Sequence, residues 1–298
     1  MRSFSFRKPK TPGFGINRGF YLTVLSSKPV MPPMLAIINP KGQGGAVEGF
    51  GAPLASDASK DSLGKPLERG AYAIASKDQK TVLKLLVLSK EEAGFDPDPF
   101  LRSALAKELD EELLVRIRAT WLIGQVTFES HDPMVYPAID FALEFCSTLA
   151  ELTDGVVADP IARRYMLPEQ VRQPLRADPL VDAREVVGLS HRASESGVHL
   201  FTLGMQKFGL HEIEMLGLEI TDVPLAESLL MSLAQSALLG HKLENGDRIG
   251  GKGLEFEVRD GGLDRGLWEG IDVFELLPPT LHSPGECLRA WQQSLSVS

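Results

Sequence analysis

Residues 184–205 read REVVGLSHRASESGVHLFTLGM, with two runs rich in β-branched and apolar residues on either side of the segment Ser194-Glu195-Ser196-Gly197. Small polar residues and glycine between two such runs predict a β-hairpin. Neighbouring antiparallel strands can be joined by a turn this short, whereas parallel strands need a long crossover. This stretch therefore predicts an antiparallel sheet.

The same pattern extends in both directions along the chain. AYAIAS (71–76) and TVLKLLVLS (81–89) predict a second hairpin, with 77–80 as its turn. Further strands are predicted at 19–27, 35–38, 118–130, 155–159, 212–220, 253–260 and 271–278. Residues 42–70 are predicted to form a long loop, and 160–183 a loop with one helical turn.

Apolar residues at helical spacing predict two long helices, one over 136–153 and one that opens at Asp222 and stops at Gly240. A further helix is predicted over 96–113, where an Asp-Pro start precedes leucines at four-residue steps. Helices set between groups of hairpins favour an α+β fold over a doubly wound one.

We therefore expect mostly antiparallel sheets packed with two long helices, arranged as two loosely similar sandwich units. The expected divisions are a basic arm at 1–18, an N-terminal unit at 19–130 and a C-terminal unit at 131–298. One compact body made of both units is the alternative.

Charge is unevenly distributed along the 298 residues. The net charge is −9, yet residues 1–47 hold seven basic side chains and no acidic one, so the remainder carries −16. The arm could bind an anionic surface or fold back onto the acidic body, and we favour the second. An acidic body argues against nucleic acid as the main partner and favours a basic protein.

No run of 18 apolar residues is present, so we expect no membrane span. The basic start of the chain is followed too late by too short an apolar run to predict a signal peptide. Cys146 and Cys287 match no metal or redox spacing, and a reduced, cytoplasmic protein is the simplest expectation.

The glycine-rich segment LAIINPKGQGGA (35–46) is the first candidate site. Closely spaced backbone N–H groups and a lysine could bind a phosphate; the residues concerned are Asn39, Lys41, Gly42, Gly44 and Gly45. The segment resembles the Asn-Pro loop of diacylglycerol and sphingosine kinases, but that family's second loop, Gly-Gly-Asp-Gly, has no counterpart between 60 and 130. We therefore favour a turn.

Four histidines near the hairpin are the second candidate. His191 and His199 could face each other across its turn and, with Glu212, form a metal or acid–base site. His211 opens HEIEM, which has Met215 where a metalloprotease helix needs its second histidine. The alternative, which we favour, is that backbone carbonyls satisfy these histidines, so we expect neither a metal nor another cofactor.

Residues 118–258 contain a strand leading to Gly204-Met205, Phe208-Gly209 and the acidic strand Glu212 to Glu214. This Gly-Met-x-x-Phe-Gly…Glu-x-Glu pattern resembles an uncharacterised bacterial domain family. The resemblance implies an α+β fold and a bacterial cytoplasmic setting, but no reaction.

The sequence leads us to expect a non-catalytic protein of the accessory, stress or toxin-neutralising type that binds a basic protein. The alternative is a small-molecule enzyme that uses the 39–45 loop for phosphate or the histidine group for metal or acid–base chemistry. The oligomeric state is left open.

Overall fold

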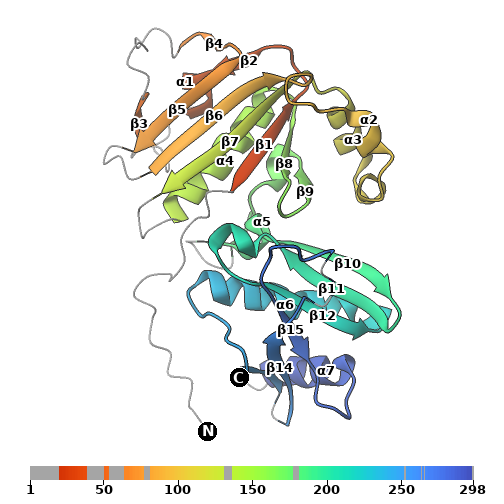
Figure 1. Cartoon of the computed structure of the whole chain (residues 1–298). Coiled ribbons are helices and arrows are strands. Elements are labelled where there is room, and N and C mark those ends of the chain that lie inside the picture. Colours follow the sequence, from red (N-terminus) through yellow and green to blue (C-terminus); the bar gives the residue numbers. More distant parts are fainter. Residues whose placement is uncertain are drawn as a thin grey trace. The chain divides into compact units, whose positions relative to one another are not determined.

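The computed structural model describes residues 20–38, 50–53, 64–76, 81–130, 136–176, 181–251, 253–262, 264 and 266–296. The described chain forms two compact units, which divide after Leu180 (Figure 1).

The first unit is built on a seven-stranded sheet with the order β3-β5-β6-β7-β1-β8-β9, and all its pairings are antiparallel. Its strands are β1 (Tyr21–Ser26), β3 (Phe50–Pro53), β5 (Gly70–Ser76), β6 (Thr81–Ser89), β7 (Leu122–Ser130), β8 (Val156–Asp159) and β9 (Arg164–Met166). Two further strands, β2 (Met31–Pro33) and β4 (Pro66–Leu67), pair with each other.

Helix α4 (Tyr136–Leu152) packs on one face of this sheet, against β1, β7 and β8. Gly124 of β7 marks the contact, because a Cβ there would lie 3.3 Å from a methyl carbon of Leu149. Val24 of β1, which pairs with Gly124, is fully buried on this face. Tyr21 and Thr23 point to the opposite face and are half-buried. On the opposite face, α3 (Glu111–Arg118) packs near β1 and β8, and no described helix lies over β5 and β6 (Figure 1).

The second unit is built on a six-stranded sheet with the order β10-β11-β12-β15-β14-β13. Its strands are β10 (Gly188–Ser194), β11 (Gly197–Leu203), β12 (Glu212–Leu218), β13 (Arg248–Gly251), β14 (Leu254–Asp260) and β15 (Val273–Leu277). The central pair, β12 and β15, is parallel, and the other pairs are antiparallel. β15 therefore joins the β10-β11-β12 half to the β14-β13 half.

Helices α6 (Val223–Leu238) and α7 (Pro284–Leu295) pack on one face of this sheet. They bury Leu229, Leu230 and Leu288 against Ile213 and Phe256, which are themselves almost fully buried. On the face turned away from these helices, alternate strand positions carry the buried polar residues His199, Glu212 and Glu214 beside a second apolar cluster, Phe201, Leu203, Trp268 and Val273.

The structure confirms the α+β class, with antiparallel and mixed sheets accompanied by helices. Both predicted hairpins form, as β5–β6 and β10–β11, and both long helices lie where their periodicity places them. The two units differ in plan: their strand orders differ, and the first sheet has α4 on one face and α3 on the other, whereas α6 and α7 lie on one face of the second sheet.

The single helix predicted over 96–113 is wrong. The chain forms α2 (Pro97–Leu101), a 3-10 helix η3 (Leu105–Glu108) and α3 (Glu111–Arg118). Leu109 and Asp110 are extended between the last two, with ψ angles of 148° and 149°. After this break, α3 buries Leu113 and Ile117 in a core cluster against which Leu101 and Leu109 also pack.

Two other predictions need correction. The run 35–38 is helical, in α1 (Met34–Ile38), because residues three apart, Met34 and Ile37, both turn into the core. The segments expected to be loops contain β3 and β4 and, later, β9 and α5 (Ala183–Val186), while η4 (Pro168–Gln170) matches the single helical turn expected within 160–183. α5 takes up the start of the run expected as a strand from 184, so β10 begins at Gly188.

The segment 131–180, expected in the C-terminal unit, belongs with the first sheet because β8 pairs with β1 and β9 pairs with β8. Neither β13 nor α7 was predicted from the sequence. Ser283 and Glu286 form the capping box that begins α7, and Pro284 occupies its first turn, so a signal for this helix is present in the sequence. The 1–18 arm and the 77–80 turn lie outside the described residues.

Candidate functional site

His199 and Glu214 form a buried pair on the face of the second sheet that points away from α6 and α7. They lie on the neighbouring strands β11 and β12, and His199 Nε2 lies 2.9 Å from Glu214 Oε2. The exposed fraction of each side chain is 2%. A buried carboxylate is costly unless hydrogen bonds satisfy its oxygens, so its other partners decide what this pair does.

Glu214 accepts two more hydrogen bonds, both from the connection between β14 and β15. The Trp268 indole N–H donates to Oε2 at 2.7 Å, and the Gly262 backbone N–H donates to Oε1 at 2.7 Å. The Trp268 ring also packs edge-on against Phe201 of β11, with ring centroids 5.3 Å apart. Glu214 therefore fastens this connection to the sheet.

The pair continues to the surface through Arg192 on β10. Its Nε–H donates to His199 Nδ1 at 3.2 Å, and its Nη2 lies 2.5 Å from Asp264 Oδ2. Because Nδ1 accepts this hydrogen bond, Nε2 carries the imidazole hydrogen and donates it to Glu214. Asp264–Arg192–His199–Glu214–Trp268, hereafter the polar chain, thus runs from an exposed ion pair to a buried indole.

The polar chain has the residue types of an acid–base site but lacks its access. Both nitrogens of His199 are occupied by protein partners, and each oxygen of Glu214 accepts a hydrogen bond from the β14–β15 connection. A general base needs to reach a substrate proton. The polar chain is arranged to hold the β14–β15 connection in place.

Glu214 should make folding stability depend on pH. Burial opposes its ionisation, but hydrogen bonds from His199, Gly262 and Trp268 outweigh it and hold the pKa below the ordinary 4.5. Its contribution is therefore present above the ordinary pKa and is lost as the pH falls through the folded-state pKa. Between about pH 6 and about pH 3.5, we expect wild type to lose more unfolding free energy in urea than Glu214→Gln does. Equal losses would contradict this assignment.

The structure does not assemble the predicted His191–His199–Glu212 group. His191 lies opposite Leu200 and is exposed, whereas Arg192 lies opposite His199. Successive residues of a strand point to opposite faces, so His191 and His199, one register step apart, cannot converge. His211 lies just before β12, and its ring stacks on Phe274 at a centroid distance of 4.1 Å.

Glu212 instead accepts hydrogen bonds from the turn that follows β11. Its Oε1 accepts from the N–H groups of Gly204 at 2.7 Å and Gln206 at 3.2 Å, and its Oε2 accepts from Thr202 Oγ1 at 2.8 Å. Burial raises its pKa against these hydrogen bonds and the nearby charge of Lys207. Every partner named here belongs to the β11–η5 turn (η5, Met205–Phe208), so Glu212 stabilises that turn.

The glycine-rich candidates Asn39, Lys41, Gly42, Gly44 and Gly45 lie outside the described residues. Within the described residues, no three side chains of histidine, cysteine, aspartate or glutamate come together as metal ligands. No helix in that part of the chain is long and apolar enough to cross a membrane. Cys146 and Cys287 are both free and buried, and burial raises the pKa of each thiol.

A more open site lies on the face of the first sheet that is turned away from α4, beside the part of that face on which α3 packs. A hollow of about 300 Å³ is bounded there by β1, β6, β7, β8, β9 and the turn before α2. Its lining includes Tyr21, Leu88, Phe95, Ile123, Gln125 and Tyr165. Burial, with a smaller effect of Tyr21, raises the pKa of the Tyr165 hydroxyl, which therefore stays protonated as a hydrogen-bond donor.

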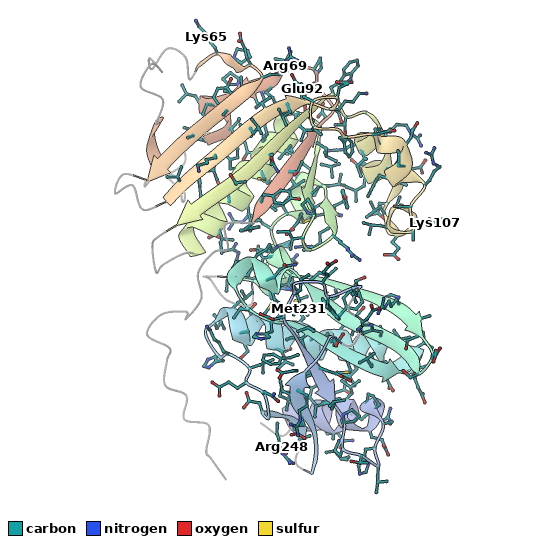
Figure 2. The ribbon with its side chains drawn as sticks, viewed as in Figure 1. Lys65, Arg69, Glu92, Lys107, Met231 and Arg248 are labelled. Atoms are coloured by element: carbon teal, nitrogen blue, oxygen red, sulfur yellow. The ribbon has the colours of Figure 1, made fainter. Side chains whose placement is uncertain are left out.

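The turn beside this hollow is acidic. Residues 91–98, EEAGFDPD, carry four carboxylates and no base, and Ala93, Gly94 and Phe95 within it line the hollow. Glu92 is partly neutralised by Arg69 at 3.0 Å (both are labelled in Figure 2). On the far side, Arg164 lies opposite Asp159 in the β8–β9 pairing. The turn gives this side of the hollow a negative potential.

The sequence did not predict Glu214 as the partner of His199, Trp268 as a donor to Glu214, or Tyr21 and Tyr165 as parts of one hollow. The spacing Glu212-x-Glu214 puts both carboxylates on one face of β12, a signal that was available. The contact of Trp268 with Glu214 and the proximity of Tyr21 to Tyr165 join residues far apart in sequence, so no local sequence pattern predicts them.

Comparisons with known proteins add no assignment: no protein-family model, no curated protein and no solved structure matches this chain. The resemblance of residues 118–258 to an uncharacterised bacterial family stays a prediction.

Proposed function

We propose that this chain is a non-catalytic binding protein, and that the hollow between β1, β7 and β9 takes a lysine or arginine side chain from a basic protein partner. The observation that carries the proposal is the pairing of Tyr21 and Tyr165 over an apolar floor beside the acidic 91–98 turn.

The chemistry of the lining fits such a side chain in two parts. Leu88 and Ile123 offer an apolar surface to an aliphatic stem. Tyrosine rings attract a cation through their quadrupole, an interaction of about 0.5–2 kcal/mol depending on how far the site is desolvated. The net charge of −9 adds long-range attraction for a basic partner.

The absence of an accessible reactive centre among the described residues supports a binding role over catalysis. The polar chain is internally satisfied, and both cysteine thiols are buried with raised pKa values. The alternative of a small-molecule enzyme has its phosphate loop outside the described residues and its histidine group dispersed.

The test uses blocked tripeptides, glycine-X-glycine, with X as arginine, lysine, norleucine or glutamate. With the four tyrosines ring-labelled for NMR, we expect the arginine and lysine peptides to shift the signals of Tyr21 and Tyr165 but not of Tyr72. Tyr21→Leu should weaken arginine-peptide binding about three- to tenfold, because the cation–ring contact is lost while most apolar volume remains.

Tyr72→Leu is the matched control, because Tyr72 pairs with the buried Leu85 and its side chain lies on the other face of the same sheet. It should leave peptide binding unchanged. Equal shifts from the norleucine and arginine peptides, or equal weakening by both substitutions, would refute the proposal.

A further inference from the structure

A second, smaller hollow lies in the 181–298 unit, and its chemistry differs from that of the first. It has a volume of about 130 Å³ and lies between the end of η5, the start of β12, the end of α6 and β15. Leu210, Ile213, Ala237 and Phe274 form its apolar lining. It shares no residue with the polar chain or with the hollow of the first sheet.

The polar side chains in the lining are both basic. Lys242 and His211 belong to it, and both are exposed. The His211 ring lies nearly parallel to the Phe274 ring, with 14° between their planes and 4.1 Å between their centroids. This stacking fixes the imidazole beside the apolar floor, where its N–H can meet a ligand.

Lys242 is available for a ligand. With the residues that the structure describes, it forms neither a hydrogen bond nor an ion pair. Residues 181–298 contain twice as many aspartates and glutamates as lysines and arginines. A lysine without an acidic partner, in the same hollow as an imidazole, is therefore unusual for this unit. An anionic group is the complement of such a pair, and Lys242 would pair with it as a point charge.

The volume limits the size of the ligand. A cavity of about 150 Å³ lined by leucine, isoleucine and phenylalanine accommodates benzene, so about six heavy atoms fit a space of this size. Ordinary drug-sized ligands need about 300 Å³ or more. The apolar part must therefore be a short or branched chain of a few carbons.

We infer that this hollow binds a small aliphatic monocarboxylate, with its carboxylate at Lys242 and His211 and its hydrocarbon chain on Leu210, Ile213 and Phe274. The ligand class follows from an apolar floor, a basic rim and a small volume. This inference is independent of the proposed partner site, because the two hollows lie in different units.

The test uses isovalerate as the probe and the uncharged isovaleramide as its isostere. Binding is followed through the methyl signal of Met205, which lines the hollow, in protein labelled at methionine methyl groups. We expect saturable shifts of Met205 with isovalerate and at least tenfold weaker binding of isovaleramide. Lys242→Gln should weaken isovalerate binding by at least tenfold and leave isovaleramide binding unchanged.

Two control variants separate local from general charge effects. Lys242→Arg keeps the cation and should keep isovalerate binding within about threefold. Arg248→Gln removes an exposed charge of the same unit that does not line the hollow (labelled in Figure 2), and should have no effect. Equal binding of the acid and the amide, no saturable shift of Met205, or equal losses in Lys242→Gln and Arg248→Gln would overturn the inference.

Discussion

Glu214→Ala is expected to lower the free energy of unfolding of the 181–298 unit by about 3–5 kcal/mol, the range for removing one partner of a buried, hydrogen-bonded pair. The substitution leaves three buried donors without their acceptor: His199 Nε2–H, Trp268 Nε1–H and the Gly262 N–H. Each unsatisfied donor keeps its desolvation cost, and water cannot replace the carboxylate without opening the core. Urea unfolding followed by tryptophan fluorescence measures the loss.

Glu219→Ala is the matched control for this experiment. Glu219 directly follows β12 and is exposed, so its removal should change the unfolding free energy by no more than about 0.5 kcal/mol. If Glu214→Ala were as mild as Glu219→Ala, the β14–β15 connection would be held by Trp268 packing alone.

Gly251→Ala should have the second-largest effect, about 2–3 kcal/mol of lost stability. A Cβ at Gly251 would lie 2.3 Å from the backbone oxygen and 2.5 Å from the carbonyl carbon of Ala290. Since Ala290 is part of α7, the clash involves backbone on both sides, and no rotamer change can relieve it. The helix must move away from β13, with which it makes its most extensive contact.

Gly266→Ala gives the comparison for Gly251→Ala. A Cβ at Gly266 would meet Asp264 Oδ1 at an ordinary 3.4 Å, so we expect a change within about 0.5 kcal/mol. Thermal unfolding of both variants distinguishes the cases. A Gly251→Ala variant as stable as Gly266→Ala would mean that α7 can shift on its strand without cost.

Local patterns predicted most of the elements but not their breaks. Alternation and β-branched content located β7 and the β10–β11 hairpin, and Pro224 with its leucine stripe located α6. The four-residue leucine spacing at 96–113 wrongly predicted one continuous helix. The spacing shows only which residues could share a helix face, and it does not reveal that Leu109 and Asp110 are extended between two helices. The domain boundary failed because strand pairing, rather than spacing along the chain, decides to which sheet β8 belongs.

The candidate sites were harder to predict. His199 was identified, but its partner is Glu214 instead of Glu212. Both carboxylates lie on the same face of β12, and the β11–β12 register brings Glu214 to His199 and Glu212 to Thr202. Both hollows combine residues from several elements, and Tyr21 and Tyr165 are separated by most of the first unit. Sequence reasoning can nominate residue types, but it needs the strand register to say which of them meet.

The position of β15 has a consequence for synthesis on the ribosome. Because β15 lies between β12 and β14, the sheet of the second unit cannot be completed until residues 273–277 have left the exit tunnel. Its parallel partner Glu212–Leu218 is made some sixty residues earlier and must wait with an unpaired edge. The first unit, complete by Leu180, can fold meanwhile, so translation itself orders the two folding events.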